Sequence, residues 1–261
     1  MQLLKFELYK IAIQKSIYIA FVLLIGATLI EQTLPNGAMN SIIFVNPLLT
    51  GMMLLIGLST IFTKEYSSGV DNYILSSKKG RWELVGAKIG ASLIYTLVVI
   101  FTWEVFNLTY NHLKFGTTGW GEPIQSIPRY AGSPYHFSMI EFHVVQMGVH
   151  VLGALCFSLV IILISSISKN ALIAFVLNLL ILAGPSLEFM DEIPIPWIVA
   201  ALPFAFFNLL MVQPFFVEAT TVSIFGVSLL SPIFACLLMV VLGGIFIVLI
   251  YQIMKKKEIT A

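Results

Sequence analysis

Charged residues are scarce in this sequence of 261 residues, which contains 14 Lys and Arg and 13 Asp and Glu residues, or 10% of the chain. Apolar residues make up 59%, and the mean hydropathy is +0.97. Soluble globular domains contain about a quarter charged residues, so this composition excludes that class. The sequence predicts an all-α, multi-pass membrane protein with one transmembrane domain over residues 1–261.

Cysteine is also rare. The two cysteines, Cys156 and Cys236, lie in apolar runs, and their spacing supports neither a disulfide nor a metal site. Both are expected to be small buried side chains. The charged, amphipathic start of the chain has no clear cleavage site, so no cleavable signal peptide is expected.

Motifs for nucleotide binding and catalysis are missing as well. The chain has no GxxxxGK[ST] phosphate-binding loop, no HExxH and no Asp-rich repeat. His136, His143 and His150 recur every seven residues, but on a helix His143 and His150 are about 10.5 Å apart, too far to share one metal ion. We therefore expect these histidines to pack between helices, and we expect no catalytic residue, metal or other cofactor in this chain.

Uncharged runs divide the sequence into six segments that approach the roughly 20 residues a transmembrane helix needs. The predicted spans are 16–30, 41–62, 89–110, 142–168, 170–187 and 230–254. Before them, residues 1–15 place Leu4, Leu8 and Ile11 on one helical face and the basic residues mostly elsewhere. This pattern predicts an amino-terminal helix that lies on the membrane surface.

The distribution of positive charge predicts the orientation. With a cytoplasmic amino terminus, six spans place 12 Lys and Arg residues in the cytoplasm and leave Lys114 and Arg129 outside. Residues 193–217 are uncharged but contain four prolines, and a seventh span there would place lysines 255–257 outside. We therefore expect 193–217 to form an outer re-entrant hairpin, and both termini to be cytoplasmic in a cell-membrane protein.

One long polar stretch, residues 64–88, lies between the second and third spans. Eight of its 25 residues are charged. We expect a cytoplasmic docking loop in which residues 70–75 form a short helix that presents Tyr73 and Ile74 to a partner. Glu65 is expected to cap a helix or to pair with a nearby base, Lys64, Lys88 or Arg81. The alternative is a solvated linker that merely follows the positive-inside rule.

This architecture resembles the type-2 ABC exporter permeases, a class that includes bacitracin and lantibiotic self-protection permeases and sodium or drug exporters. The family's pattern after the second span matches Phe62, Glu65, Gly69, Ile74, Leu75, Ser76, Ser77, Arg81 and Lys88. The resemblance implies a coupling helix that contacts an ATPase. The expected coupling residues are Glu65, Gly69, Val70, Tyr73, Ile74, Leu75, Arg81 and Lys88.

The resemblance further implies the transmembrane subunit of an ATP-driven exporter that moves a hydrophobic or amphipathic substrate outward by alternating access. The substrate would be a peptide antibiotic, a drug or a lipid-like compound. ATP and Mg²⁺ would bind a separate P-loop ATPase subunit. The other expected partners are a second permease subunit, identical or homologous, and membrane lipid, with no nucleic acid.

Polar residues within or beside the apolar runs are candidates for the substrate path, because a charge at bilayer depth costs at least about 2.5–3.5 kcal/mol. Glu104 lies about 24 Å from Lys88 along a helix, near the outer edge of a core about 30 Å thick, where it could also be an interfacial anchor. Three asparagines could contact substrate or bond helix to helix: Asn46, Asn178 and Asn208. Glu188, in an outer acidic group, could attract a cationic substrate.

Two other classes of function remain open at this stage. A polytopic membrane enzyme would need catalytic groups that converge at one membrane depth, and the histidines offer only a weak candidate. A membrane immunity or sensor protein that binds an antibiotic without transporting it would need no structured cytoplasmic loop. Dependence on an ATPase separates the exporter from both.

Overall fold

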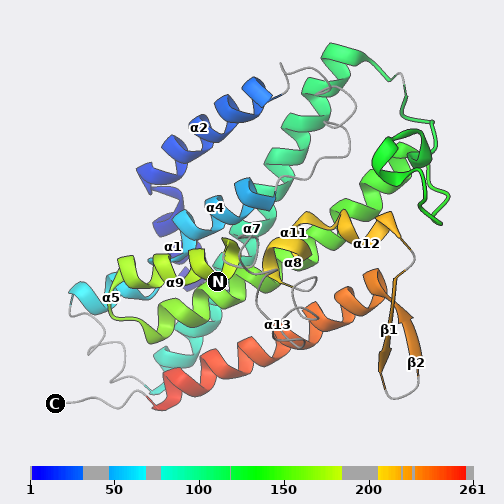
Figure 1. Ribbon diagram of the computed structural model, residues 1–261. Helices are drawn as coiled ribbons and strands as arrows, with labels where there is room; N and C mark the ends of the chain where they lie inside the picture. The colour runs from blue at the N-terminus through cyan, green and yellow to red at the C-terminus, as the bar shows by residue number, and fades with distance from the viewer. Residues whose placement is uncertain are drawn as a thin grey trace.

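A computed structural model describes residues 2–31, 47–68, 78–117, 119–183, 205–218, 220–224 and 227–256, which are mostly helical (Figure 1). The α-helices are α1 (Gln2–Ala12), α2 (Lys15–Glu31), α4 (Pro47–Leu58), α5 (Thr63–Ser68), α7 (Lys78–Phe115), α8 (Met139–Ile167), α9 (Ala171–Ala183), α11 (Phe206–Met211), α12 (Pro214–Val217) and α13 (Ser231–Lys256). Two 3₁₀ turns, η1 (Ile124–Ser126) and η2 (Pro128–Tyr130), and two strands, β1 (Thr221–Ile224) and β2 (Val227–Leu230), complete the described elements.

Several helices are long and apolar enough to cross a membrane. Within the described ranges these are Leu48–Glu65, Trp82–Lys114, Met139–Ile167 and Ser231–Lys256. Helices α1 and α2 form a possible fifth span that bends by 55° between them, and α9 is a shorter apolar helix of 13 residues. The structure thus has the helices that a multi-pass membrane protein requires. Six spans, and a surface position for α1, remain predictions.

Helix α8 is the centre of the packing. It contacts α4, α7, α9, α11 and α13 along its length. Its apolar core includes Phe157 and Ile161, which are fully buried. At Gly153 the backbone of α11 comes so close that an added Cβ would lie 2.8 Å from the Leu209 carbonyl oxygen. Because Gly153 has no side chain, α11 can pack directly against the backbone of α8.

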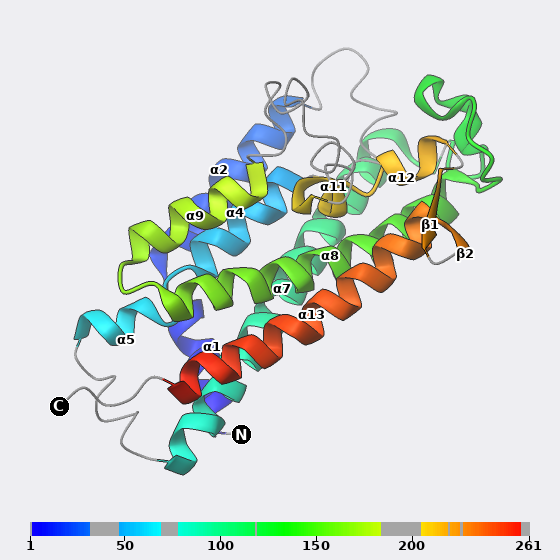
Figure 2. The same cartoon turned by 60° about the horizontal axis from the view of Figure 1, so that its bottom comes forward.

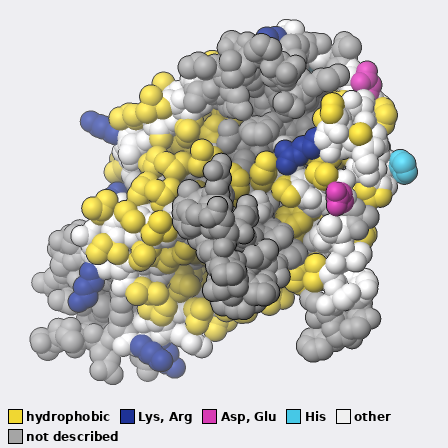
Figure 3. All heavy atoms as spheres, in the orientation of Figure 1, with side chains coloured by type: hydrophobic (Ala, Val, Ile, Leu, Met, Phe, Trp, Pro, Cys, Tyr) yellow, Lys and Arg dark blue, Asp and Glu magenta, His cyan; other side chains and the backbone are white. Residues whose placement is uncertain are grey.

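The molecule has two distinct ends, between which α7, α8 and α13 run (Figures 1 and 2). Helices α1 and α5, the start of α7 and the end of α13 gather at one end. The β-strands, η1, η2 and α12 lie at the other. Apolar side chains cover much of the described surface between the ends (Figure 3). The side of the membrane on which each end lies remains a prediction.

The structure differs from the sequence-based expectation at two places. Helix α7 begins at Lys78 rather than at 89, so part of the expected loop 64–88 is helical. In addition, β1 and β2 form an antiparallel hairpin, with Thr221 opposite Leu230, which an all-α fold does not contain. Three of the four residues of β1 are β-branched, whereas β2 has only Val227, so the sequence signal for a pair of strands is weak.

The expected re-entrant hairpin, 193–217, is described only from residue 205 onward. There α11 and α12 are joined at Val212, whose φ of 62° lies in the left-handed region. Helix α11 packs on α4, α8 and α9, and α12 contacts α13 and η2. The described part is therefore covered by protein on several sides, as an irregular segment at membrane depth requires. The hairpin itself remains a prediction.

Candidate functional site

A buried ion-pair arrangement joins three segments that are far apart in the sequence. Lys88, near the start of α7, has a fully buried side chain. Its Nζ lies 2.7 Å from Glu65 Oε1 and 3.2 Å from Glu7 Oε2, and it donates a hydrogen bond to the Ile61 carbonyl at 2.7 Å. An ammonium group has three N–H donors, so these three acceptors satisfy it.

Helix α1 supplies the remaining members. Glu7 is 1% exposed, and Lys10 Nζ lies 2.8 Å from Glu7 Oε1 and 3.1 Å from Glu65 Oε1. Burial disfavours the charged form of Lys10, but hydrogen bonds to Glu7 and Glu65 and their negative charges raise its pKa above the ordinary value. We call Glu7, Lys10, Glu65 and Lys88 the ionic cluster. Its two carboxylates balance its two ammonium groups, which offsets the cost of removing them from water.

The ionic cluster connects the two ends of the polar stretch 64–88. Glu65 lies in the first turn of α5, and of the three bases proposed for it, Lys88 is in direct contact. The expected coupling residues Gly69, Val70, Tyr73, Ile74 and Leu75 lie outside the described residues. Arg81 lies in α7, but its side chain is outside the described part of the structure. Of the expected coupling residues, the structure therefore brings together Glu65 and Lys88.

Glu7 and Lys10 were not predicted from the sequence as site residues. The signal was present, because Glu7 is three residues after Leu4 and four before Ile11, on the apolar stripe of α1. A charge on such a stripe needs a partner when the stripe is buried. The partner could not be identified from sequence because Lys88 is distant along the chain.

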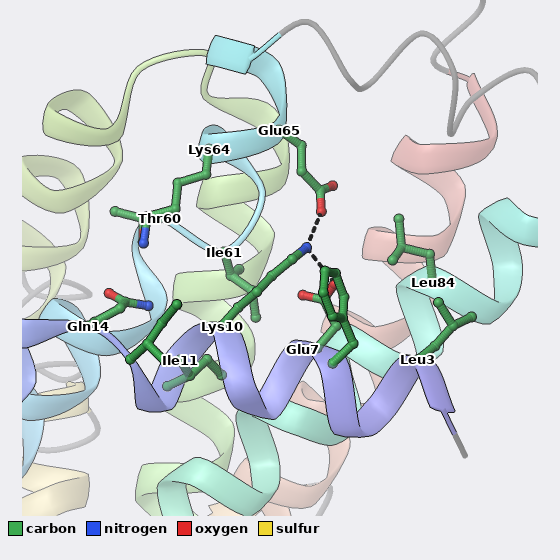
Figure 4. A pocket seen from close by; sticks show the side chains of 12 residues that line it. Leu3, Glu7, Lys10, Ile11, Gln14, Thr60, Ile61, Lys64, Glu65 and Leu84 are labelled. Carbon is green, nitrogen blue, oxygen red and sulfur yellow. Dashed lines mark hydrogen bonds and ion pairs between the residues drawn. The ribbon is translucent and has the colours of Figure 1, made fainter.

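A groove opens beside the ionic cluster, between α1, the segment 60–65 and Leu84 of α7 (Figure 4). Its volume is about 650 Å³. Lys10 crosses from α1 toward Glu65 in its middle, with Gln14 and Lys64 at one end and Leu3 and Leu84 at the other. The groove thus combines apolar walls with charged groups.

A second buried polar pair lies between α7 and α8. Glu104 Oε2 is 3.2 Å from His143 Nε2, and the two side chains are 3% and 2% exposed. Gln146, one turn further along α8, is fully buried, and neither its side-chain oxygen nor its nitrogen has a hydrogen-bond partner in the described part of the structure. The burial of Glu104 against α8 does not fit an anchor exposed at the membrane surface.

Comparison with known proteins assigns no family to this chain. No family model, curated protein or solved structure matches it. The resemblance to type-2 ABC exporter permeases therefore remains a prediction, and the ionic cluster and the polar groups within the spans carry the functional inference.

The other candidates for the substrate path are dispersed among several elements. Asn178 is buried in α9, and its Nδ2 donates to the Ala174 carbonyl of the same helix at 2.7 Å. Asn208 lies in α11, while Asn46 and Glu188 are outside the described residues. A role for these four residues remains a prediction.

The histidines of α8 contact neighbouring elements. His150 Nδ1 is 2.6 Å from the Leu210 carbonyl oxygen of α11, and Nε2 is 3.1 Å from Thr50 Oγ1 of α4. His150 thus bridges three helices, as expected of a packing histidine. Within the described residues, no three His, Cys, Asp or Glu side chains form a group that could hold a metal ion.

Proposed function

We propose that this chain is the transmembrane subunit of an ATP-driven exporter of the type-2 ABC class. Its substrate is hydrophobic or amphipathic, such as a peptide antibiotic, a drug or a lipid-like compound. ATP and Mg²⁺ bind a separate P-loop ATPase, and a second permease subunit completes the transport path. The observation that carries the proposal is the contact of Lys88 with Glu65 and Glu7.

A loop that transmits force needs firm attachment at both ends. The ionic cluster provides this attachment, since Glu65 follows α4 and Lys88 belongs to α7. A push on the residues between them acts on both helices together, and through Glu7 it also acts on α1. A solvated linker has no need of a fully buried ammonium group at its end, so the cluster favours docking over the linker alternative.

Helix α7 could carry a movement of the stretch 64–88 across the membrane. Its 38 residues form one helix, about 57 Å long at 1.5 Å per residue, which exceeds the thickness of a bilayer core. Near its other end Glu104 faces His143 of α8. In the proposed cycle, closure of the ATPases tilts α7 relative to α8, changes this buried polar contact and opens a path outward.

Affinity purification from membranes of the native host tests the proposal. A P-loop ATPase should co-purify with the wild-type chain, be identified by mass spectrometry and bind ATP. Tyr73→Ala and Gly69→Pro should each reduce its recovery, whereas the matched changes Tyr135→Ala and Gly132→Pro, in the connection between α7 and α8, should not. Failure to recover any P-loop ATPase, or equal recovery with all four variants, would contradict the proposal.

A further inference from the structure

Three polar side chains on the packed faces of α7 and α8 have unused hydrogen-bonding groups. Glu104 Oε2 and His143 Nε2 lie 3.2 Å apart, yet neither atom makes a hydrogen bond with good geometry. Glu104 Oε1, His143 Nδ1 and both amide atoms of Gln146 also have no hydrogen-bond partner in the described part of the structure. Gln146 follows His143 by three residues, on the same face of α8. Buried polar groups are almost always hydrogen-bonded, so this arrangement indicates a function.

The negative charge of Glu104 has few possible partners. Helices α4, α9 and α11, which pack on α8, contain no acidic residue, basic residue or histidine, and those of α13 are in its last turn. Helix α1 contacts the start of α7, where the ionic cluster lies. The nearest other acidic or basic residues on α7 and α8 are Lys88, His112 and Glu141. In the described part of the structure, the electrostatic partners of Glu104 are His143 and His150.

Of these two histidines, His150 is already satisfied in its neutral form. Its Nδ1 lies 2.6 Å from the Leu210 carbonyl oxygen, which only accepts hydrogen bonds, so the hydrogen of a neutral ring belongs on Nδ1. The hydroxyl of Thr50 can then donate to Nε2 across 3.1 Å. A neutral His150 therefore uses both nitrogens, and the compensation of Glu104 is left to His143.

We propose that Glu104 and His143 together bind one proton within the candidate spans. The proton is either on the imidazole, beside a carboxylate, or on the carboxyl group, beside a neutral imidazole, and the pair is uncharged in both cases. Without the proton the pair has a buried negative charge, and with a second proton it has a buried positive charge, and both are costly. Gln146 can adapt to either arrangement, because its amide both donates and accepts hydrogen bonds.

A proton fits this pair better than a metal ion does. Within the described residues, no three His, Cys, Asp or Glu side chains form a group that could hold a metal ion. A proton needs neither a third ligand nor a cavity, and Glu104 and His143 are both packed and only 2% exposed. Ionisable residues inside transmembrane segments commonly serve as proton sites.

Movement of α7 relative to α8 would let this proton exchange with water. In the proposed transport cycle, separation of the two helices hydrates the Glu104 carboxylate, and the His143 imidazolium releases its proton to water. The pair takes one proton from water when the helices close again. Proton exchange during transport rests on the proposed function, whereas proton binding by the closed pair does not.

Proton release on unfolding tests the site. The purified full-length chain is unfolded with SDS in weakly buffered detergent solution at about pH 8, and a pH-sensitive dye counts the released protons. Unfolded Glu and His side chains are both deprotonated at about pH 8, so the pair in wild type should release one proton per chain. Glu104→Gln should release one proton fewer, because a neutral amide beside a neutral imidazole holds none. Glu141→Gln, which changes an exposed carboxylate of α8, should match wild type.

A second variant tests the site without removing the carboxyl group. In His143→Gln the proton must be on Glu104, so the infrared spectrum of the folded protein should contain a protonated carboxyl band that shifts when glutamate is labelled with ¹³C. The site is overturned if wild type and Glu104→Gln release equal numbers of protons, if Glu141→Gln also releases one fewer, or if His143→Gln lacks this band. Both measurements use the chain without an ATPase, so this proposal and the proposed function can fail separately.

Discussion

Lys88 Nζ lies 2.7 Å from Glu65 Oε1, and this contact joins the two ends of the polar stretch 64–88. The ammonium group is fully buried and also contacts Glu7 of α1. The Lys88 ammonium group therefore connects α1, α5 and α7, which are far apart in the sequence. In the proposed exporter, a force on the stretch 64–88 is transmitted through this contact to α4, α7 and α1 together.

Lys88→Met should strongly destabilise the protein. It removes the buried ammonium group that contacts the carboxylates of both Glu7 and Glu65. Removing one partner of a buried ion pair costs about 3–5 kcal/mol. Unfolding of the purified protein in detergent measures the change, with Lys114→Met as the matched control at an exposed position. Equal unfolding midpoints for the two variants would contradict the energetic role of the ionic cluster.

Glu7→Gln should loosen α1 and leave the rest of the fold in place. The change removes one of the two carboxylates that Lys10 and Lys88 contact, while the contacts of both lysines with Glu65 remain. Hydrogen exchange should rise in residues 2–12 but not in α8. Lys5→Gln, at an exposed position of the same helix, should show no such rise. If the amide hydrogen-exchange rates of residues 2–12 are unchanged in Glu7→Gln, Glu7 does not hold α1 against α7.

His143→Leu should destabilise the protein because it removes the imidazole that lies 3.2 Å from the buried carboxylate of Glu104. A buried polar group without a partner costs about 1–3 kcal/mol, and more when it is charged. His136→Leu, at an exposed position, should be close to neutral. Adding Glu104→Leu to His143→Leu should recover part of the loss, since replacing both partners by apolar groups can be nearly neutral. If the double variant is less stable than His143→Leu alone, the prediction that Glu104 and His143 stabilise each other is contradicted.

Gly153→Ala should weaken the packing of α11 on α8. The new methyl group would meet the Leu209 carbonyl oxygen at 2.8 Å, so the two backbones must separate. Overpacking of this kind costs about 1–3 kcal/mol. Gly148→Ala, one and a half turns earlier on α8 with no atom within 4 Å, should be neutral or slightly stabilising. Thermal unfolding compares the two, and an equal response would rule out the close contact.

The sequence predicts the long helices well because their signal is local. The apolar run expected over 142–168 corresponds to α8, Met139–Ile167, which starts slightly earlier because Ser138 and Glu141 form a capping box. The two-stranded hairpin was missed because two four-residue strands give too weak a pattern beside an apolar helix.

The candidate site was only partly predictable. Glu65 and Lys88 could be named from the charges of one polar stretch, and pairing between them was among the options. Glu7 and Lys10 could not be placed there, because their role depends on how α1 packs against the start of α7. Likewise, the pairing of Glu104 with His143 depends on the rotation of α7 relative to α8, which the apolar pattern of each helix does not specify.

Cross-linking from residue 73 is the most direct test of the account. A Tyr73→Cys variant, purified in complex with its co-purifying P-loop ATPase, is treated with a short thiol-reactive photo-cross-linker, and the product is mapped by mass spectrometry. The account predicts a cross-link to the ATPase from residue 73 and none from the control His136→Cys, in the connection between α7 and α8. No cross-link from residue 73, or equal cross-linking from both positions, would contradict the claim that the stretch 64–88 docks an ATPase.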